Sequence, residues 1–156
     1  MKALLLAAAL ALGTGPALAQ LFGQQELLDP DKAFRISARA LDARNVEVTF
    51  QIADGYYMYR ERFRFATADG RPLTGVQVPR GKVKEDQFFG KQETFRDFVR
   101  MRIPLSAADA AKGSITLKVT SQGCSDQGVC YVPQTQDVTV QLLRPWCAPY
   151  SLCSCF

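Results

Sequence analysis

Apolar and polar residues alternate along much of this chain, and this period of two restricts its fold more than any other feature. The clearest run is residues 46–52, in which valine, phenylalanine and isoleucine alternate with glutamate, threonine and glutamine. Similar runs cover residues 99–105, 115–120 and 138–142, and residues 76–78 form a shorter one. Successive side chains of a β-strand point to opposite faces, so each run predicts a half-buried strand.

A further strand is expected around residues 60–65, where arginines alternate with phenylalanines. This prediction places three basic side chains on one solvated face: Arg60, Arg62 and Arg64. Pro104 interrupts the run in which it lies and predicts a strand end or a sheet edge, because proline cannot donate a ladder hydrogen bond.

Helix signals are few and short. Asp29-Pro30 predicts a single turn with proline in its first position. Residues 106–112 predict a brief helix that ends before Gly113. Short strands separated by turns, with little helix, indicate one all-β domain over residues 20–143 with the architecture of an antiparallel β-sandwich.

Residues 1–19 have the pattern of a cleaved signal peptide. Lys2 precedes an apolar run over residues 3–12, and Ala17-Leu18-Ala19 supplies the small residues that a signal peptidase reads. The apolar run is shorter than the roughly 20 residues that a membrane-spanning helix requires. We therefore expect export to the periplasm, where disulfides form and persist.

Residues 144–156 show no strand or helix period and hold three of the five cysteines, Cys147, Cys153 and Cys155. We expect an irregular tail that is disordered or reflects a truncated or altered reading frame. Thiols in such a tail make a poor metal site.

The chain contains no histidine, which excludes Cys–His nucleophiles, serine–histidine triads and the usual mixed zinc sites. The formal net charge is +4, removal of Lys2 leaves +3, and the positive residues are scattered. We therefore expect no nucleic-acid interface. We also expect no metal and no organic cofactor, and a monomer.

The stretch best suited to chemistry is residues 123–133, in which Cys124 and Cys130 flank the turn-forming residues 126–128. Across a hairpin their Cα atoms would lie about 5.5 Å apart, which suits a disulfide. A structural staple is the commoner use of such a bond in secreted domains. However, closing so short a loop contributes only about 2–2.5 kcal/mol. Spacing alone leaves both a staple and a redox-active pair open.

Two other stretches are rich in aromatic residues. Residues 84–91 carry Phe88 and Phe89 among charges and a glycine, which indicates either an exposed loop with an apolar tip or a strand end with both rings in the core. Residues 54–60 are dense in tyrosine. They indicate either core packing or a contact surface for client proteins.

Together these stretches resemble one family, the N-terminal periplasmic domain of the thiol:disulfide interchange protein DsbD. The matching residues are Asp-Gly-Tyr-Tyr-Met-Tyr-Arg at 54–60, Glu-Asp-Gln-Phe-Phe-Gly-Lys at 85–91, and Gly-Cys-Ser-Asp-Gln-Gly-Val-Cys-Tyr-Val-Pro at 123–133. The resemblance extends from about Leu21 to Leu143. It implies an immunoglobulin-like sandwich with both cysteines near one end.

The resemblance also implies a role for each site residue. Cys130 matches the cysteine that forms a mixed disulfide with clients, and Cys124 matches the one that resolves it. The loop around Phe88 would form a cap that moves aside on docking. The other implied residues are Asp86, Gln87, Phe89 and Gly90 in the cap, and Tyr57, Tyr59 and Tyr131 for client contact.

The implied activity is that of a protein-disulfide reductase. A membrane-embedded donor would reduce the pair, which would then reduce a periplasmic disulfide isomerase and a thioredoxin-like protein of cytochrome c maturation. Family members continue into a transmembrane and a thioredoxin-like domain. We therefore expect either a separate donor protein or a sequence that is a fragment of a longer one. Two rival interpretations are a non-catalytic immunoglobulin-like binding module with a structural disulfide and a metal-trafficking domain.

The resemblance places Asp86 close to Cys130, where its carboxylate would raise the pKa of the thiol by like-charge repulsion. Gln87 stands where the family often has an acidic residue, so less negative charge surrounds the pair here. Titration of Cys130 in an Asp86→Asn variant should give a lower thiol pKa than in the parent chain. An unchanged value would contradict this role for Asp86.

Overall fold

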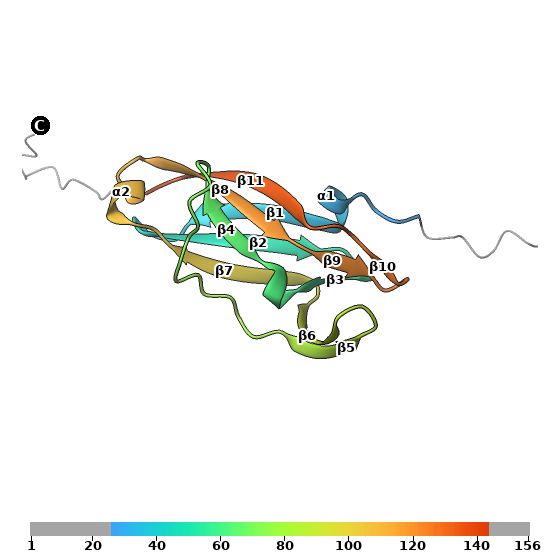
Figure 1. Ribbon diagram of the computed structural model, residues 1–156. Coiled ribbons are helices and arrows are strands. Elements are labelled where there is room, and N and C mark those ends of the chain that lie inside the picture. Colours follow the sequence, from blue (N-terminus) through green and yellow to red (C-terminus); the bar gives the residue numbers. More distant parts are fainter. Residues whose placement is uncertain (1–25, 144–156) are drawn as a thin grey trace, which may run out of the picture.

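The computed structural model describes residues 26–143, so the expected signal peptide at 1–19 and the expected tail at 144–156 lie outside the described residues. Within 26–143 the regular secondary structure is almost entirely β (Figure 1). The elements are, in order, α1 (Pro30–Ala33), β1 (Phe34–Ala40), β2 (Asn45–Ile52), β3 (Tyr56–Tyr59), a 3₁₀ turn η1 (Arg60–Arg62), β4 (Arg64–Thr67), β5 (Lys82–Asp86), β6 (Gly90–Phe95), β7 (Phe98–Pro104), α2 (Ala107–Ala110), β8 (Ser114–Ser121), β9 (Gly123–Ser125), β10 (Val129–Cys130) and β11 (Gln134–Gln141).

The described strands form three antiparallel sheets with the orders β1-β2-β7, β10-β9-β3-β6-β5 and β11-β8-β4. Figure 1 shows β11-β8-β4 layered over β1-β2-β7, with α2 at one end and the β9–β10 hairpin at the other. The β5–β6 hairpin projects from the body close to that second end. The predicted antiparallel β-sandwich is confirmed. Neither helix in residues 26–143 has the length and apolar character needed to cross a bilayer.

The core follows the alternation of the sequence. In β2 the residues Val46, Val48 and Phe50 are fully buried, and the residues between them are not. The same alternation holds along β7 and β8. These buried faces meet between the layers, which confirms the strands predicted for residues 46–52, 99–105 and 115–120 and the strand end at Pro104.

Strand β3 departs from this pattern because all four of its residues are buried. Tyr56 and Met58 belong to the main core, whereas Tyr57 and Tyr59 belong to a second cluster with Cys124. β3 therefore separates the sandwich core from the cysteine pair, and burial of both faces hides the period of two.

The prediction that Arg60, Arg62 and Arg64 share one strand face is wrong. The chain leaves β3 through the 3₁₀ turn η1, and β4 begins only at Arg64. This turn carries the chain from the sheet of β3 into the sheet of β4. The run at 76–78 is not a strand either, since Gln77 makes only an isolated bridge to Arg102.

Both short helices begin as expected. Pro30 occupies the first turn of α1, although the Asp29 side chain makes no capping bond. Ser106 caps α2, because its side chain accepts a hydrogen bond from the backbone N–H of Asp109. Gly113 follows with φ of 75°, a conformation that glycine adopts readily.

Asp109 is the only described acidic residue that is fully buried, at 1% exposure. Its carboxylate accepts two hydrogen bonds from Arg71, at 2.9 and 2.7 Å, one from Lys112 at 2.9 Å and one from the Ser106 hydroxyl at 2.6 Å. These bonds hold the pKa of Asp109 well below its usual range, and the bond from Ser106 has the largest effect. The network joins α2 to the loop after β4.

Asp109→Asn should destabilise the domain by about 2 kcal/mol, because a buried charge-assisted network loses its acceptor. Since folding lowers the pKa of Asp109, its contribution is present above the unfolded value of about 4 and is lost as the pH falls further. Chemical unfolding at neutral and acidic pH measures both effects.

The exposed pair of Lys118 and Asp137, 3.7 Å apart, provides a control. Asp137→Asn should change stability little, because exposed ion pairs contribute little. If Asp109→Asn matched this control in both size and pH dependence, the proposed stabilising role of the network would be wrong.

Candidate active site

Cys124 and Cys130 lie directly opposite each other in the β9–β10 hairpin and form a disulfide. The predicted turn between them closes with a hydrogen bond from the N–H of Gly128 to the carbonyl of Ser125, and Gly128 has φ of 81°. Their Cα atoms are 4.0 Å apart, closer than the roughly 5.5 Å expected. The N–H of Tyr131 donates a hydrogen bond to the carbonyl of Gly123, so the ladder bond lies next to the cysteines and not between them. The cysteines are therefore a non-hydrogen-bonded pair, and the Cα atoms of such pairs lie closer together than those of hydrogen-bonded pairs.

The two sulfur-bearing residues differ in their exposure. Cys124 is fully buried against Tyr57 and Tyr59, whereas Cys130 is only partly buried. Cys130 lies on β10, an edge strand that pairs with β9 alone. Only Cys130 is therefore placed where a second protein can reach it without first opening the hairpin.

Gly123 fixes the hairpin against the sandwich. A Cβ at this position would lie 2.4 Å from the Phe34 ring and 2.6 Å from the carbonyl oxygen of Tyr57. β9 therefore approaches β3 so closely that only glycine fits. This contact explains why a glycine precedes Cys124.

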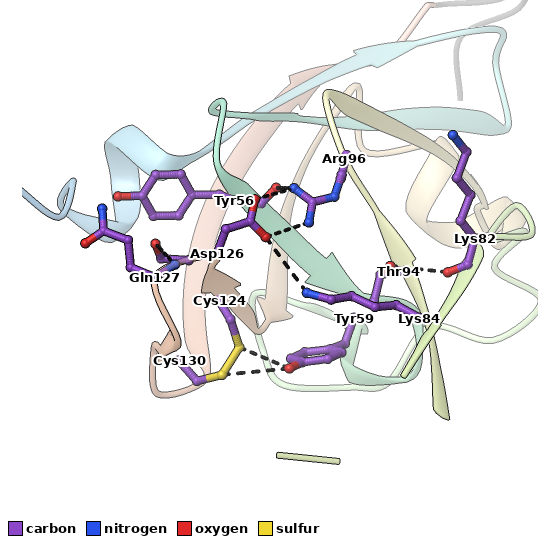
Figure 2. A network of polar contacts seen from close by, with 11 residues as sticks. Tyr56, Tyr59, Lys82, Lys84, Thr94, Arg96, Cys124, Asp126, Gln127 and Cys130 are labelled. Atoms are coloured by element: carbon purple, nitrogen blue, oxygen red, sulfur yellow. Dashed lines mark hydrogen bonds and ion pairs between the residues drawn. A yellow bond between two sulfur atoms is a disulfide. The ribbon is translucent and has the colours of Figure 1, made fainter. Parts of the chain in front are cut away.

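The hydroxyl of Tyr59 touches both sulfurs, as Figure 2 shows. It lies 3.1 Å from Sγ of Cys124 and 3.7 Å from Sγ of Cys130. The Tyr59 side chain is fully buried. A phenol in this position can donate a hydrogen bond to whichever sulfur carries more negative charge.

Asp126, the first residue of the turn, ties the hairpin to its neighbours. It accepts two hydrogen bonds from Arg96, at 2.8 and 2.6 Å, and lies 3.8 Å from Nζ of Lys84 (Figure 2). The ammonium of Lys84 also sits 3.5 Å from the centre of the Tyr57 ring. The bonds from Arg96 lower the pKa of Asp126, and the same bonds raise the pKa of Arg96.

The loop between β5 and β6 reaches toward the disulfide. Phe88 and Phe89 are 44% and 37% exposed, so the exposed-loop interpretation is correct and the core alternative is wrong. The Phe89 ring packs edge-on against Tyr59 with centroids 5.2 Å apart, and the Arg62 guanidinium lies 4.5 Å over its centre. Gly90 ends the loop with φ of 71°.

The other side of this loop meets the cysteine hairpin. If Gly128 carried a Cβ, that atom would lie 3.1 Å from Nε2 of Gln87, so the loop and the cysteine hairpin nearly touch. A cavity of about 250 Å³ lies between them and is lined by Tyr57, Lys84 and Asp126 among others. The side chain of Asp86 lies outside the described part of the structure.

The three tyrosines expected to contact clients occupy different positions. Tyr57 and Tyr59 are 2% and 0% exposed, so neither offers a surface to another protein in this conformation. Tyr131 is partly buried, and its hydroxyl donates a hydrogen bond to the carbonyl of Leu28. Burial, with a contribution from Tyr56, raises the pKa of Tyr131 to about 12, which keeps this donor protonated.

Sequence reasoning did not identify Arg62, Lys84 or Arg96 as parts of the site. All three come from other elements, and their relation to the cysteines depends on how the hairpins pack. Residues 26–143 contain no cluster of three or more histidine, cysteine, aspartate or glutamate side chains arranged to hold a metal ion.

An edge hairpin bearing one buried and one accessible cysteine, on an antiparallel sandwich, defines an immunoglobulin-like dithiol domain. Residues 24–142 match the family model described as "Thiol:disulfide interchange protein DsbD, N-terminal". The chain belongs to this family, as its sequence resemblance predicted.

Full-length relatives carry the same name. The DsbD protein of Ralstonia nicotianae is 47% identical over 119 residues, which cover 74% of this chain and 19% of the relative. The DsbD protein of Escherichia coli K12 is 39% identical over 116 residues, which cover 74% and 20% respectively. The chain thus spans about a fifth of the length of these relatives.

Two solved structures from Neisseria meningitidis are similar in fold. The reduced DsbD N-terminal domain has a TM-score of 0.64 and 35% identity, over 74% of this chain and 90% of that one. A complex between the DsbD N-terminal and PilB N-terminal domains has a TM-score of 0.57 and 36% identity, over 72% and 85%. The immunoglobulin-like fold expected from the resemblance is confirmed.

Phe89→Ala should make the disulfide easier to reduce. Removing the ring eliminates its contact with Tyr59, and such aromatic pairs contribute about 1 kcal/mol. We expect the rate of reduction by dithiothreitol to rise about fivefold at unchanged fold. Phe98→Ala is the matched control, because Phe98 is 56% exposed on β7, outside the site. Equal rates for both variants would contradict a shielding role for Phe89.

Proposed function

We propose that this domain carries out thiol–disulfide exchange with protein clients in the periplasm, as a protein-disulfide reductase. The observation that carries the proposal is the unequal burial of two cysteines paired across one hairpin. A purely structural disulfide does not need one accessible partner on an edge strand. Exchange does need it, because a client sulfur must approach one cysteine in line while the second waits beside it.

The proposed reaction starts from the reduced pair. The Cys130 thiolate attacks one sulfur of a client disulfide, and the client's other sulfur leaves and takes up a proton. The Cys124 thiol then loses its proton and attacks Sγ of Cys130, which forms the Cys124–Cys130 bond and releases the second client thiol. Two electrons and two protons pass from the pair to the client.

Tyr59 is placed to assist both steps. Its hydroxyl already contacts both sulfurs, so it can donate a hydrogen bond to a thiolate at either position. Cys124 stays within reach of the mixed disulfide because Gly123 holds β9 against β3. These contacts support Cys130 as the attacking residue and Cys124 as the resolving one.

The cap role is assigned to the loop of residues 86–90. In the oxidised state Phe89 packs on Tyr59 beside the disulfide, which limits access by small thiols and oxidants. A docking client would displace the loop and expose Tyr57 and Tyr59 alongside Cys130. In that open state Tyr57, Tyr59 and Tyr131 would contact the client.

The proposed electron source is a membrane-embedded thiol donor. The relatives are about five times as long as the stretch that matches this chain, which leaves room for such a donor in the same polypeptide. The proposed clients are thioredoxin-like proteins and a disulfide isomerase. The Neisseria complex of the DsbD and PilB N-terminal domains supports a protein client for this fold. Export with cleavage after Ala19, and a folded domain beginning at Gln20 and ending near Leu143, complete the proposal.

Cys124→Ala should trap a mixed disulfide through Cys130, because the resolving thiol is gone. After incubation with the oxidised PilB N-terminal domain, non-reducing electrophoresis should reveal a covalent adduct that reductant removes. The tail cysteines Cys147, Cys153 and Cys155 are replaced by serine in every sample, so that only one pair can react.

Cys130→Ala is the matched control and should give no adduct, because Cys124 is fully buried. Adducts of equal yield through either cysteine would contradict the assigned roles. Loss of the folded state on reduction of the parent chain would instead favour a structural staple.

A further inference from the structure

A strongly basic cavity lies on the sheet that also carries the redox hairpin. A cavity of about 540 Å³ lies along β5 and β6 and is lined by four cationic residues, Arg80, Lys82, Lys84 and Arg96. Asp97 also lines it, so four cations face one carboxylate within the described residues. Such a concentration differs from the scattered charge that the sequence suggested.

Backbone packing forms one wall of this cavity. A Cβ on Gly81 would lie 2.7 Å from the carbonyl oxygen of Thr94, so β5 enters the sheet in direct contact with β6. The Thr94 hydroxyl then donates a hydrogen bond to the carbonyl of Lys82. These contacts fix the strand from which Lys82 and Lys84 project, two residues apart and thus on one face.

The four cations fall into an outer and an inner pair. Arg80 and Lys82 are exposed and make no ion pair within residues 26–143. Lys84 and Arg96 are both engaged by Asp126, the turn residue between the two cysteines (Figure 2). The inner pair therefore belongs both to the cavity and to the redox hairpin.

The cavity is linked to the cysteine cluster through Lys84, which lines the cavity and contacts Tyr57. Nζ of Lys84 lies 3.5 Å from the centre of the Tyr57 ring, and Tyr57 is the direct cross-strand neighbour of Cys124. A molecule that contacts Lys84 in the cavity would thus be separated from the buried cysteine by two side chains, those of Lys84 and Tyr57.

We propose that this basic cavity binds an acidic segment of the client polypeptide, with Arg80 and Lys82 capturing its carboxylates first. Carboxylates that reach the inner pair would compete with Asp126 for Arg96 and Lys84. Docking would then loosen the turn that carries the cysteine pair. This inference rests on the proposed function and adds the chemistry by which the domain selects its clients.

Two probes that differ only in charge test the proposal. Each is a short peptide closed by a disulfide, flanked in one case by four glutamates and in the other by four glutamines. The reduced full chain, with its three tail cysteines replaced by serine, should reduce the glutamate peptide about fivefold faster at low ionic strength. High salt should remove the difference, because it screens exposed charges.

Arg80→Gln/Lys82→Gln should abolish the preference for glutamate while leaving the rate with hydroxyethyl disulfide, a small uncharged substrate, unchanged. The matched control, Arg35→Gln/Arg100→Gln, removes the same charge from exposed positions on the β1-β2-β7 sheet and should keep the preference. Equal loss in both double variants would mean that net charge alone attracts the peptide, and would overturn the proposal.

The binding step has a separate readout. A dye-labelled hexaglutamate peptide without cysteine should bind the oxidised chain in fluorescence anisotropy, and a hexaglutamine peptide should not. Equal rates and equal binding for both peptides would overturn the cavity proposal and leave thiol exchange intact. Reduction of neither peptide by the parent chain would contradict the proposed exchange function itself, whatever the anisotropy shows.

Discussion

Burial of β3 on both faces is the constraint on which the site depends. Tyr56 and Met58 point into the sandwich core, and Tyr57 and Tyr59 point toward the cysteine pair. A strand that is anchored by the core cannot shift without exposing apolar surface, which costs about 25 cal/mol per Å². The disulfide hairpin therefore rests on a rigid support, and the hydroxyl of Tyr59 is held in place beside both sulfurs.

The opposite side of the pair is covered by an exposed loop. The loop between β5 and β6 packs the Phe89 ring against Tyr59 and Arg62 and brings Gln87 close to Gly128, and both of its phenylalanines remain more than a third exposed. Contacts of this size are easily broken by a docking protein. A rigid wall behind the sulfurs and a weakly held loop in front of them suit a reaction in which one partner must enter and leave.

The sandwich could be predicted from sequence because its main strands each expose one face. Residues 46–52 and 115–120 alternate visibly for that reason. β3 could not be predicted from alternation, since both of its faces are buried. The 3₁₀ turn η1 could not be predicted either, because its arginines follow the pattern of an exposed strand face. The site was predictable only as far as the cysteines, the turn, the aromatic loop and the tyrosines of residues 56–59. The ion pairs of Asp126 with Arg96 and Lys84 join residues at least 30 positions apart, and no local pattern reveals them.

The close approach at Gly123 has a consequence for the range of sequences that this fold accepts. One of the two obstacles to a side chain there is the Phe34 ring, which a second mutation could shrink. The other is the carbonyl oxygen of Tyr57, which is main chain and is present whatever residue occupies position 57. No compensating substitution can remove this oxygen, so the backbone itself prevents the replacement of glycine at position 123 during evolution.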